Sequence, residues 1–266
     1  MAYKILAEEM LTEFDDNVIL NAFEDLINFK WDGFDELEKY KLQKIFEANL
    51  RNKSLFPNIS TCNEFAERNE KEQLKEYLFL WGNKYLNARL PSQHEGAASK
   101  SPYDAMIYHL LSMCPGIGLN EEQTRKAHEM AMQSENLIGE LLEEFINKQI
   151  SPYGWIWCKG AVMVATDFYY QKPNGDELFL QIKNKFNTEN SSSSKVRTGT
   201  KIQKWNRLIN KRLSGSNEAQ SNWPALQEIV YSQANIIPKN KSELSETGFS
   251  KFLDFVSANN PSIIIF

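Results

Sequence analysis

An aspartate and a glutamine–lysine pair lie fourteen residues apart in a segment that the sequence predicts to be a β-hairpin. Asp167 stands in the first apolar stretch, and Gln181-Ile182-Lys183 stands in the second. Residues i and i+2 of a strand point to the same side, so Gln181 and Lys183 are expected to point together. Mg²⁺ prefers carboxylate and other oxygen ligands, and a nearby lysine can position or deprotonate a water molecule. This combination suits metal-dependent hydrolysis of a phosphodiester bond.

The hairpin needs a particular register for these side chains to meet. An Asn-Gly pair between the two stretches is typical of a tight turn. If the turn has two residues, Asp167 pairs with Ile182 and faces away from Gln181 and Lys183. A three-residue loop over residues 174–176 would instead pair Asp167 with Lys183, and a bulge near Asp167 would also bring the three side chains together. We predict one of these two irregularities.

Hydrophobic periodicity predicts the elements that must position the hairpin. Residues 1–150 are expected to be mostly helical. A long helix is expected from about residue 120, with an interruption near Gln133 as an alternative. After it we expect the strands of the hairpin, a short amphipathic helix with a basic side, a last helix and a closing strand. The ranges are 155–171 and 178–186 for the strands, 200–213 and 245–260 for the helices, and 261–266 for the closing strand. This order predicts an α/β fold with one sheet flanked by helices.

The charge distribution marks a surface for phosphates. The whole chain has a net charge of −5, which by itself argues against a nucleic-acid binder. Residues 183–212, however, hold nine lysines and arginines and a single acid, Glu189, so this window carries +8 and the rest carries −13. A basic stripe on an acidic body is the usual footprint of a nucleic-acid contact.

The cysteines, histidines and hydropathy exclude other classes of protein. The three cysteines and three histidines are scattered, so neither a disulfide framework nor a zinc motif is predicted. No apolar run approaches the roughly 18 residues of a membrane span, and the first residues do not resemble a secretory signal. The sequence therefore predicts a cytoplasmic protein that has no membrane partner.

The hairpin resembles that of the PD-(D/E)xK nuclease superfamily, in which an acid on one strand precedes an acid-x-lysine on the next. Thr166-Asp167 takes the place of the first pair, and Gln181-x-Lys183 takes the place of the second. An amide oxygen is a weaker metal ligand than a carboxylate, although some restriction enzymes of the superfamily carry Gln or Asn there. The resemblance implies a mixed-sheet core in which Asp167 and Gln181 hold Mg²⁺ and Lys183 activates the attacking water.

The resemblance also points to an acid on the long helix. Members of the superfamily often carry a glutamate before the first strand in a Gly-x-x-x-Glu context, which Gly139 and Glu143 match. It implies that Glu143 is a further catalytic and metal-binding residue, with Glu140 as the second choice. The alternative is that these acids only solvate a face of the helix.

The residues that follow Lys183 are the most specific part of the pattern. Asn184 to Arg207 resembles the block after the catalytic lysine in SinI-like and HaeIII-like type II restriction endonucleases, and the likeness extends over roughly residues 135–225. Asn, Ser and Arg side chains can contact base edges, whereas Lys and Arg also hold phosphates. The DNA contacts implied are Asn187, Asn190, Ser191, Ser192, Ser193, Ser194, Lys195, Arg197, Lys201, Lys204 and Arg207.

These observations together favour a type II restriction endonuclease. We expect a helical region over residues 1–119 and a PD-(D/E)xK-like catalytic and DNA-recognition core over residues 120–266. The implied target is a GC-rich palindrome of the GGCC or GGWCC kind in double-stranded DNA, cut by a homodimer. A cognate methyltransferase would protect the host. A repair or junction nuclease of the same fold and a non-catalytic DNA-binding protein stay open as alternatives.

Overall fold

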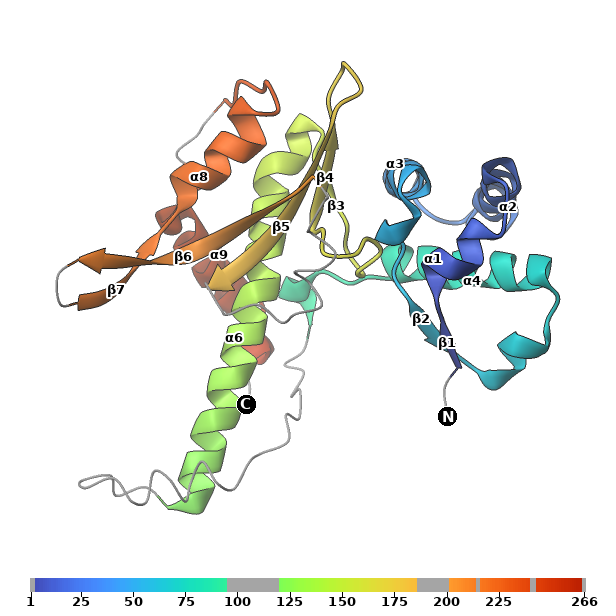
Figure 1. Ribbon diagram of the computed structural model, residues 1–266. Coiled ribbons are helices and arrows are strands. Elements are labelled where there is room, and N and C mark those ends of the chain that lie inside the picture. The colour runs from blue at the N-terminus through green and yellow to red at the C-terminus, as the bar shows by residue number, and fades with distance from the viewer. Residues whose placement is uncertain (1–2, 95–119, 186–200, 214–215, 240–242, 265–266) are drawn as a thin grey trace. The chain divides into compact units, whose positions relative to one another are not determined.

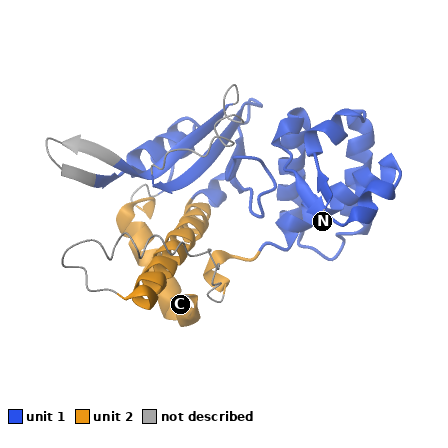
Figure 2. Ribbon diagram, turned by 60° about the horizontal axis from the view of Figure 1, so that its bottom comes forward, with its two compact units in different colours: residues 1–88, 150–239 blue, residues 89–149, 240–266 orange. Residues whose placement is uncertain are grey.

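The chain folds into two compact units, each built from two separate stretches (Figure 2). The computed structural model describes residues 3–94, 120–185, 201–213, 216–239 and 243–264. The first unit comprises residues 1–88 and 150–239, and the second comprises residues 89–149 and 240–266. The division expected from the sequence, into a helical region over residues 1–119 and a catalytic and DNA-recognition core over residues 120–266, stays a prediction.

The N-terminal part of the first unit is mostly helical, as predicted. Three of its helices begin at a side chain that accepts a backbone N–H of the first turn: Asp15, Asp35 and Asn69. A two-stranded antiparallel sheet, which the sequence did not reveal, pairs Tyr3 with Thr61. The elements are β1 (Tyr3–Ile5), α1 (Ala7–Thr12), α2 (Asp16–Phe29), α3 (Glu36–Arg51), η1 (Lys53–Leu55), β2 (Ile59–Thr61), η2 (Asn63–Glu67) and α4 (Glu70–Leu86).

Aromatic side chains fill the centre of this helical part. Phe23 stacks on Phe46 with 3.8 Å between ring centroids, and Trp81 and Phe56 meet edge to face at 5.5 Å. These rings are buried, and the same core continues into the sheet through Tyr169 and Phe179. The helices therefore share one hydrophobic core with the hairpin that carries the candidate catalytic residues.

A five-stranded mixed sheet forms the rest of the first unit, with strand order β3-β4-β5-β6-β7 (Figure 1). Only the β5–β6 pair is parallel. The strands are β3 (Ile156–Trp157), β4 (Phe168–Gln171), β5 (Glu177–Lys185), β6 (Ile202–Leu213) and β7 (Ser216–Ser221). Short helical segments lie at the two ends of this stretch: η4 (Ser151–Tyr153), α8 (Trp223–Gln227) and the π-helical η5 (Glu228–Ser232). The prediction of an α/β fold with a mixed sheet and helices is confirmed at this level.

The single strand expected over residues 155–171 is wrong. Strands β3 and β4 are short, and residues 158–167 form a loop between them. Gly160, Ala161 and Ala165 have positive φ angles in this loop, which an extended strand does not allow. Val162 and Met163, whose types suggested a strand, are buried in the core shared with the helices.

The amphipathic helix expected over residues 200–213 is also wrong, because this segment is strand β6. Its apolar residues at 202, 205, 209 and 213 fit a helical period, but three of them also fit the alternation of a strand. Parallel pairing with β5 over residues 202–208 decides between the two. Tertiary pairing overrides the local pattern here.

The second unit contains the long helix and the last helix that the sequence predicts. Helix α6 (Glu121–Ile150) runs over 30 residues without the break allowed near Gln133. Helix α9 (Glu246–Asn259) begins at Ser245, whose hydroxyl accepts the Gly248 N–H. The unit also contains η3 (Pro91–Gln93) and η7 (Pro261–Ile264). The closing strand predicted over residues 261–266 is therefore wrong for the residues that the structure describes.

Within the second unit, an acid of α6 has a structural role. Glu144 is fully buried and accepts hydrogen bonds from the backbone N–H and the hydroxyl of Ser92, at 2.8 and 2.7 Å. Lys148 lies 3.0 Å from the same carboxylate.

No helix among the described residues is long and apolar enough to cross a membrane.

Candidate active site

The register of the hairpin brings Asp167, Gln181 and Lys183 to one face of the sheet. Strand β4 pairs Phe168 with Leu180, so Asp167, one residue earlier, comes opposite Gln181. The reason is a three-residue loop, Pro173 to Gly175, closed by a hydrogen bond from Gly175 N–H to Lys172 O. The odd loop length that we predict is confirmed, although the loop lies one residue earlier than expected. Asp167 precedes the first regular pair, and the register continued by one residue sets it opposite Gln181 rather than Lys183.

Asp167 sits where regular pairing of β4 ends. Its carboxylate accepts the backbone N–H of Ile182 at 2.6 Å, and its own N–H donates to Leu180 O. Burial raises the pKa of the Asp167 carboxyl to about 6, although the Ile182 hydrogen bond and the attraction of Lys183 both lower it. A desolvated carboxylate next to a buried amide and an exposed lysine is a place where a cation would be stabilised.

The helical part of the unit fixes the loop that leads into Asp167. The carbonyl oxygen of Val162 accepts hydrogen bonds from the Asn49 side chain of α3 and the Trp81 indole of α4, at 2.9 and 2.8 Å. Two residues later, Val164 N–H donates to Leu55 O at 2.8 Å. All three contacts join the loop to residues far away in the sequence. The N-terminal helices thus position the loop that leads into Asp167, a role that the sequence did not reveal.

The same loop passes so close to α4 that one position requires glycine. Gly160 has φ +76°, and a Cβ atom added there would lie 2.1 Å from the backbone oxygen of Lys84. We expect Gly160→Ala to lower the free energy of unfolding by about 2–4 kcal/mol, because it adds a left-handed strain and a backbone clash. Thermal denaturation would measure the loss. Gly33→Ala is the control, since a Cβ at Gly33 meets nothing within 4 Å and should change stability little.

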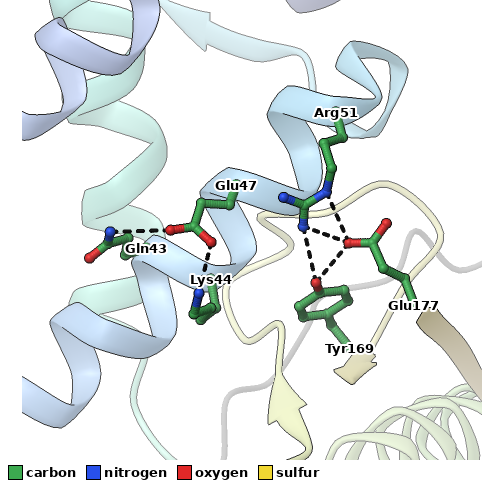
Figure 3. Close-up of polar contacts among 6 residues, drawn as sticks. All are labelled: Gln43, Lys44, Glu47, Arg51, Tyr169 and Glu177. Atoms are coloured by element: carbon green, nitrogen blue, oxygen red, sulfur yellow. Dashed lines mark hydrogen bonds and ion pairs between the residues drawn. The ribbon is translucent and has the colours of Figure 1, made fainter. Parts of the chain in front are cut away.

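A polar network joins the far end of the hairpin to α3 (Figure 3). Arg51 lies 2.6 Å from the Glu177 carboxylate, and the Tyr169 hydroxyl donates to the same oxygen at 2.7 Å. Arg51 also reaches the Tyr169 hydroxyl at 3.2 Å. Tyr169 follows Asp167 by two residues, so the network holds β4 and the start of β5 to the helix close to the candidate site.

Strand β6 adds residues to both faces of the sheet. Its parallel register with β5 places Lys204 beside Gln181 and Asn206 beside Lys183, on the face that carries Asp167. The opposite face carries Arg207, which donates a hydrogen bond to Asn184 at 2.8 Å. Of the predicted phosphate contacts, the structure brings Lys204 to the site face and places Arg207 on the other face.

Trp205 has a structural role. Its side chain is buried on the face away from Lys204, its indole N–H donates to Asn222 O at 2.9 Å, and its ring lies 5.2 Å from that of Trp223. Lys201 is exposed just before β6. The basic stripe of the expected helix is therefore divided between the two faces of a strand.

Several predicted residues lie elsewhere. Glu143 is half-buried on α6 and Glu140 is exposed, both in the second compact unit, and their part in catalysis stays a prediction. The predicted base-contacting loop lies outside the described residues. This loop comprises Asn187, Asn190, Ser191, Ser192, Ser193, Ser194, Lys195 and Arg197.

The side chains of the site face fit a hard cation. Asp167 offers a carboxylate and Gln181 an amide oxygen, and Mg²⁺ commonly takes one or two carboxylates with water and substrate phosphate as its other ligands. In the described part of the chain, no three His, Cys, Asp or Glu side chains gather closely enough to hold a metal ion. A magnesium site here would thus draw on amide, water or phosphate oxygens as well as on carboxylate.

Comparison with known proteins decides the family. The family model of the SinI restriction endonuclease matches residues 65–257, which include the hairpin, β6 and α6. The chain belongs to the SinI restriction endonuclease family. It is 31% identical over 191 residues to the type II restriction enzyme Eco47I of Escherichia coli, covering 67% of this chain and 80% of that one. It is 30% identical over 230 residues to the type II restriction enzyme SinI of Salmonella infantis, covering 83% and 92%.

Family membership resolves the alternatives that the sequence left open. This member of the SinI family is a type II site-specific deoxyribonuclease, a hydrolase of a restriction-modification system that acts on double-stranded DNA. Type II restriction enzymes generally need a divalent metal ion. The repair nuclease and the non-catalytic DNA-binding protein are therefore set aside.

Proposed function

We propose that this restriction endonuclease hydrolyses DNA with Mg²⁺ at a PD-(D/E)xK-type site built on the β4–β5 hairpin. The observation that carries the proposal is the hairpin register, which gives Asp167, Gln181 and Lys183 a common face. When bound, Mg²⁺ would supply Lewis-acid stabilisation of the charge that develops on the phosphate oxygens.

Each residue of the face has a distinct task in this proposal. Asp167 and Gln181 hold the cation through a carboxylate and an amide oxygen, and the Ile182 N–H keeps the Asp167 carboxylate oriented. Lys183 donates a hydrogen bond that orients the attacking water, and its positive charge stabilises the hydroxide that forms when this water releases its proton to solvent. Glu143 contributes a further carboxylate; it is half-buried, whereas Glu140 on the same helix is exposed.

The residues after Lys183 read the DNA in this proposal. The loop from Asn187 to Arg197 contacts base edges, with Arg197 as a bidentate donor to guanine. Lys195, Lys201 and Lys204 hold phosphates and set the register of the protein on the duplex. Arg207 contacts phosphate only if DNA reaches the face on which Asn184 lies. A GC-rich palindrome of the GGCC or GGWCC kind is the proposed target.

A palindrome has two equivalent scissile bonds, one on each DNA strand. The proposed active form is therefore a homodimer in which each subunit's active site cuts one DNA strand. The protein would work in the bacterial cytoplasm, where the genome is exposed to it. A cognate methyltransferase that modifies the same sequence is therefore the proposed genetic partner.

Digestion of phage DNA tests the proposal directly. The protein is incubated with DNA in Mg²⁺ or EDTA, and the fragment ends are sequenced. We expect discrete fragments in Mg²⁺ only, all ending at one short palindrome. Ends that share no sequence, or a shared site outside the GGCC and GGWCC kinds, would contradict the proposed specificity.

A further inference from the structure

Strand β6 places Asn206 beside Lys183. In the parallel register of β5 and β6, the two residues are direct partners, and neighbouring strands lie about 4.8 Å apart. Both side chains rise from the face that carries Asp167 and Gln181. No task for Asn206 follows from the sequence pattern.

The side-chain oxygen of Asn206 is buried and has no hydrogen-bond partner within the part of the chain that the structure describes. A buried acceptor without a partner costs about 1–3 kcal/mol, so such atoms are rare and call for an explanation. The neighbours of Asn206 on the other face are satisfied: Gln203 donates to Gln233 at 2.7 Å and Trp205 donates to Asn222. The unsatisfied acceptor of β6 thus belongs to the site face.

Lys183 is the donor that fits this acceptor. Its side chain is exposed, carries three N–H donors and turns about several flexible bonds. Bound DNA would surround the ammonium with phosphate oxygens, any of which could draw it away from the attacking water. A fixed neutral oxygen at its side would limit these orientations without adding a second negative charge.

We propose that Asn206 is a positioning residue whose side-chain oxygen accepts a hydrogen bond from the Lys183 ammonium when DNA is bound. The proposal rests on the proposed catalytic role of Lys183. In the free enzyme the unpaired oxygen lowers the stability of the fold. During cleavage the same oxygen orients Lys183. Such conflicts between stability and activity are typical of active sites.

Two substitutions at Asn206 separate positioning from packing. Asn206→Leu keeps the approximate shape and removes the acceptor, whereas Asn206→Asp keeps an acceptor oxygen. We expect Asn206→Leu to lower the single-turnover cleavage rate about 10- to 100-fold, with the Kd for the cognate duplex in Ca²⁺ unchanged. Its melting temperature without DNA should equal or exceed that of the wild type. Asn206→Asp should cleave faster than Asn206→Leu and more slowly than the wild type, because it keeps an acceptor oxygen but adds a negative charge.

The matched control is Gln203→Leu, which removes an amide of the same strand from the opposite face. It loses the hydrogen bond to Gln233, so it should be less stable and cleave at the wild-type rate. Asn206→Leu that cleaves normally, binds DNA more weakly, or melts well below the wild type would overturn the proposal. An Asn206→Asp variant as slow as Asn206→Leu would overturn it as well.

Lys183→Ala makes the two failures distinguishable. If Lys183→Ala still cleaves, the proposed function of the hairpin fails, and the Asn206 proposal falls with it. If Lys183→Ala is inactive and Asn206→Leu is normal, only the Asn206 proposal fails. When both hold, the double variant should cleave no more slowly than Lys183→Ala alone, because the two changes remove one interaction.

Discussion

Replacing Lys183 by alanine is expected to lower the cleavage rate by about 10²- to 10⁴-fold, the usual contribution of a positioned proton acceptor or donor. The substitution leaves Asp167 and Gln181 in place, so metal binding and DNA recognition should persist. The measurement is single-turnover cleavage of a duplex that carries the site, combined with binding of the same duplex in Ca²⁺.

Lys172→Ala is the matched control for that experiment. Lys172 stands in the turn of the same hairpin, five residues before β5 and outside the basic window, so its loss should leave both the rate and the Kd unchanged. A Lys183→Ala enzyme that cleaves at a rate close to the wild type would remove Lys183 from the mechanism. Lost binding together with lost cleavage would assign it to DNA contact instead.

The hairpin and its odd loop length could be predicted from the sequence because their determinants are local. An acid, an amide and a lysine on two adjacent strands, joined by a turn that contains Asn-Gly, restrict the register to a few choices. The exact loop was harder to predict: Gly175 takes φ +89°, which lets the loop run from Pro173 to Gly175. This shift by one residue changes the partner of Asp167 from Lys183 to Gln181.

What could not be predicted depends on contacts between distant residues. Asn49 and Val162 are 113 residues apart, and no local pattern indicates that one holds the other. The same holds for the loop over residues 158–167, whose apolar residues pack into a helical core instead of a strand. The role of the N-terminal helices in positioning Asp167 follows from these contacts.

Strand β6 shows why local periodicity misled. Its apolar residues fit a helix, and a helix would place Lys201, Lys204 and Arg207 on one basic side. Pairing with β5 turns the segment into a strand, so Lys204 and Asn206 alternate with Trp205 and Arg207. The error concealed Asn206, because its relation to Lys183 exists only in the parallel register.

Asp167→Asn is expected to abolish cleavage and, without metal, to make the protein more stable at neutral pH. The raised pKa means that ionising Asp167 is less favourable in the folded protein than in the unfolded chain, so its charge destabilises the fold. An asparagine removes the charge and can still accept the Ile182 N–H. We expect a gain of about 3 kcal/mol in the free energy of unfolding at pH 7–8 in EDTA.

The destabilisation caused by the ionised Asp167 carboxylate depends on pH. The penalty is fully present above pH 6, where the folded carboxylate is ionised, and it vanishes below about pH 4, where the carboxyl is protonated in both states. The stability difference between Asp167→Asn and the wild type should therefore shrink as the pH falls from 7 to 4. Asp176→Asn, which removes an exposed carboxylate of the turn, is the control for the loss of one negative charge.

Metal should reverse the order of stability. Mg²⁺ binds the ionised carboxylate of the folded wild type and stabilises it, whereas Asp167→Asn gains little. Because protons compete for the same carboxylate, the apparent affinity of the wild type for Mg²⁺ should weaken as the pH falls through about 6. Denaturation series in EDTA and in Mg²⁺ across this range measure both effects. The contrary result is an Asp167→Asn variant that is less stable than the wild type in EDTA at pH 8. It would show that other groups of the protein already compensate the charge of Asp167. A bound cation would then have no charge to neutralise there.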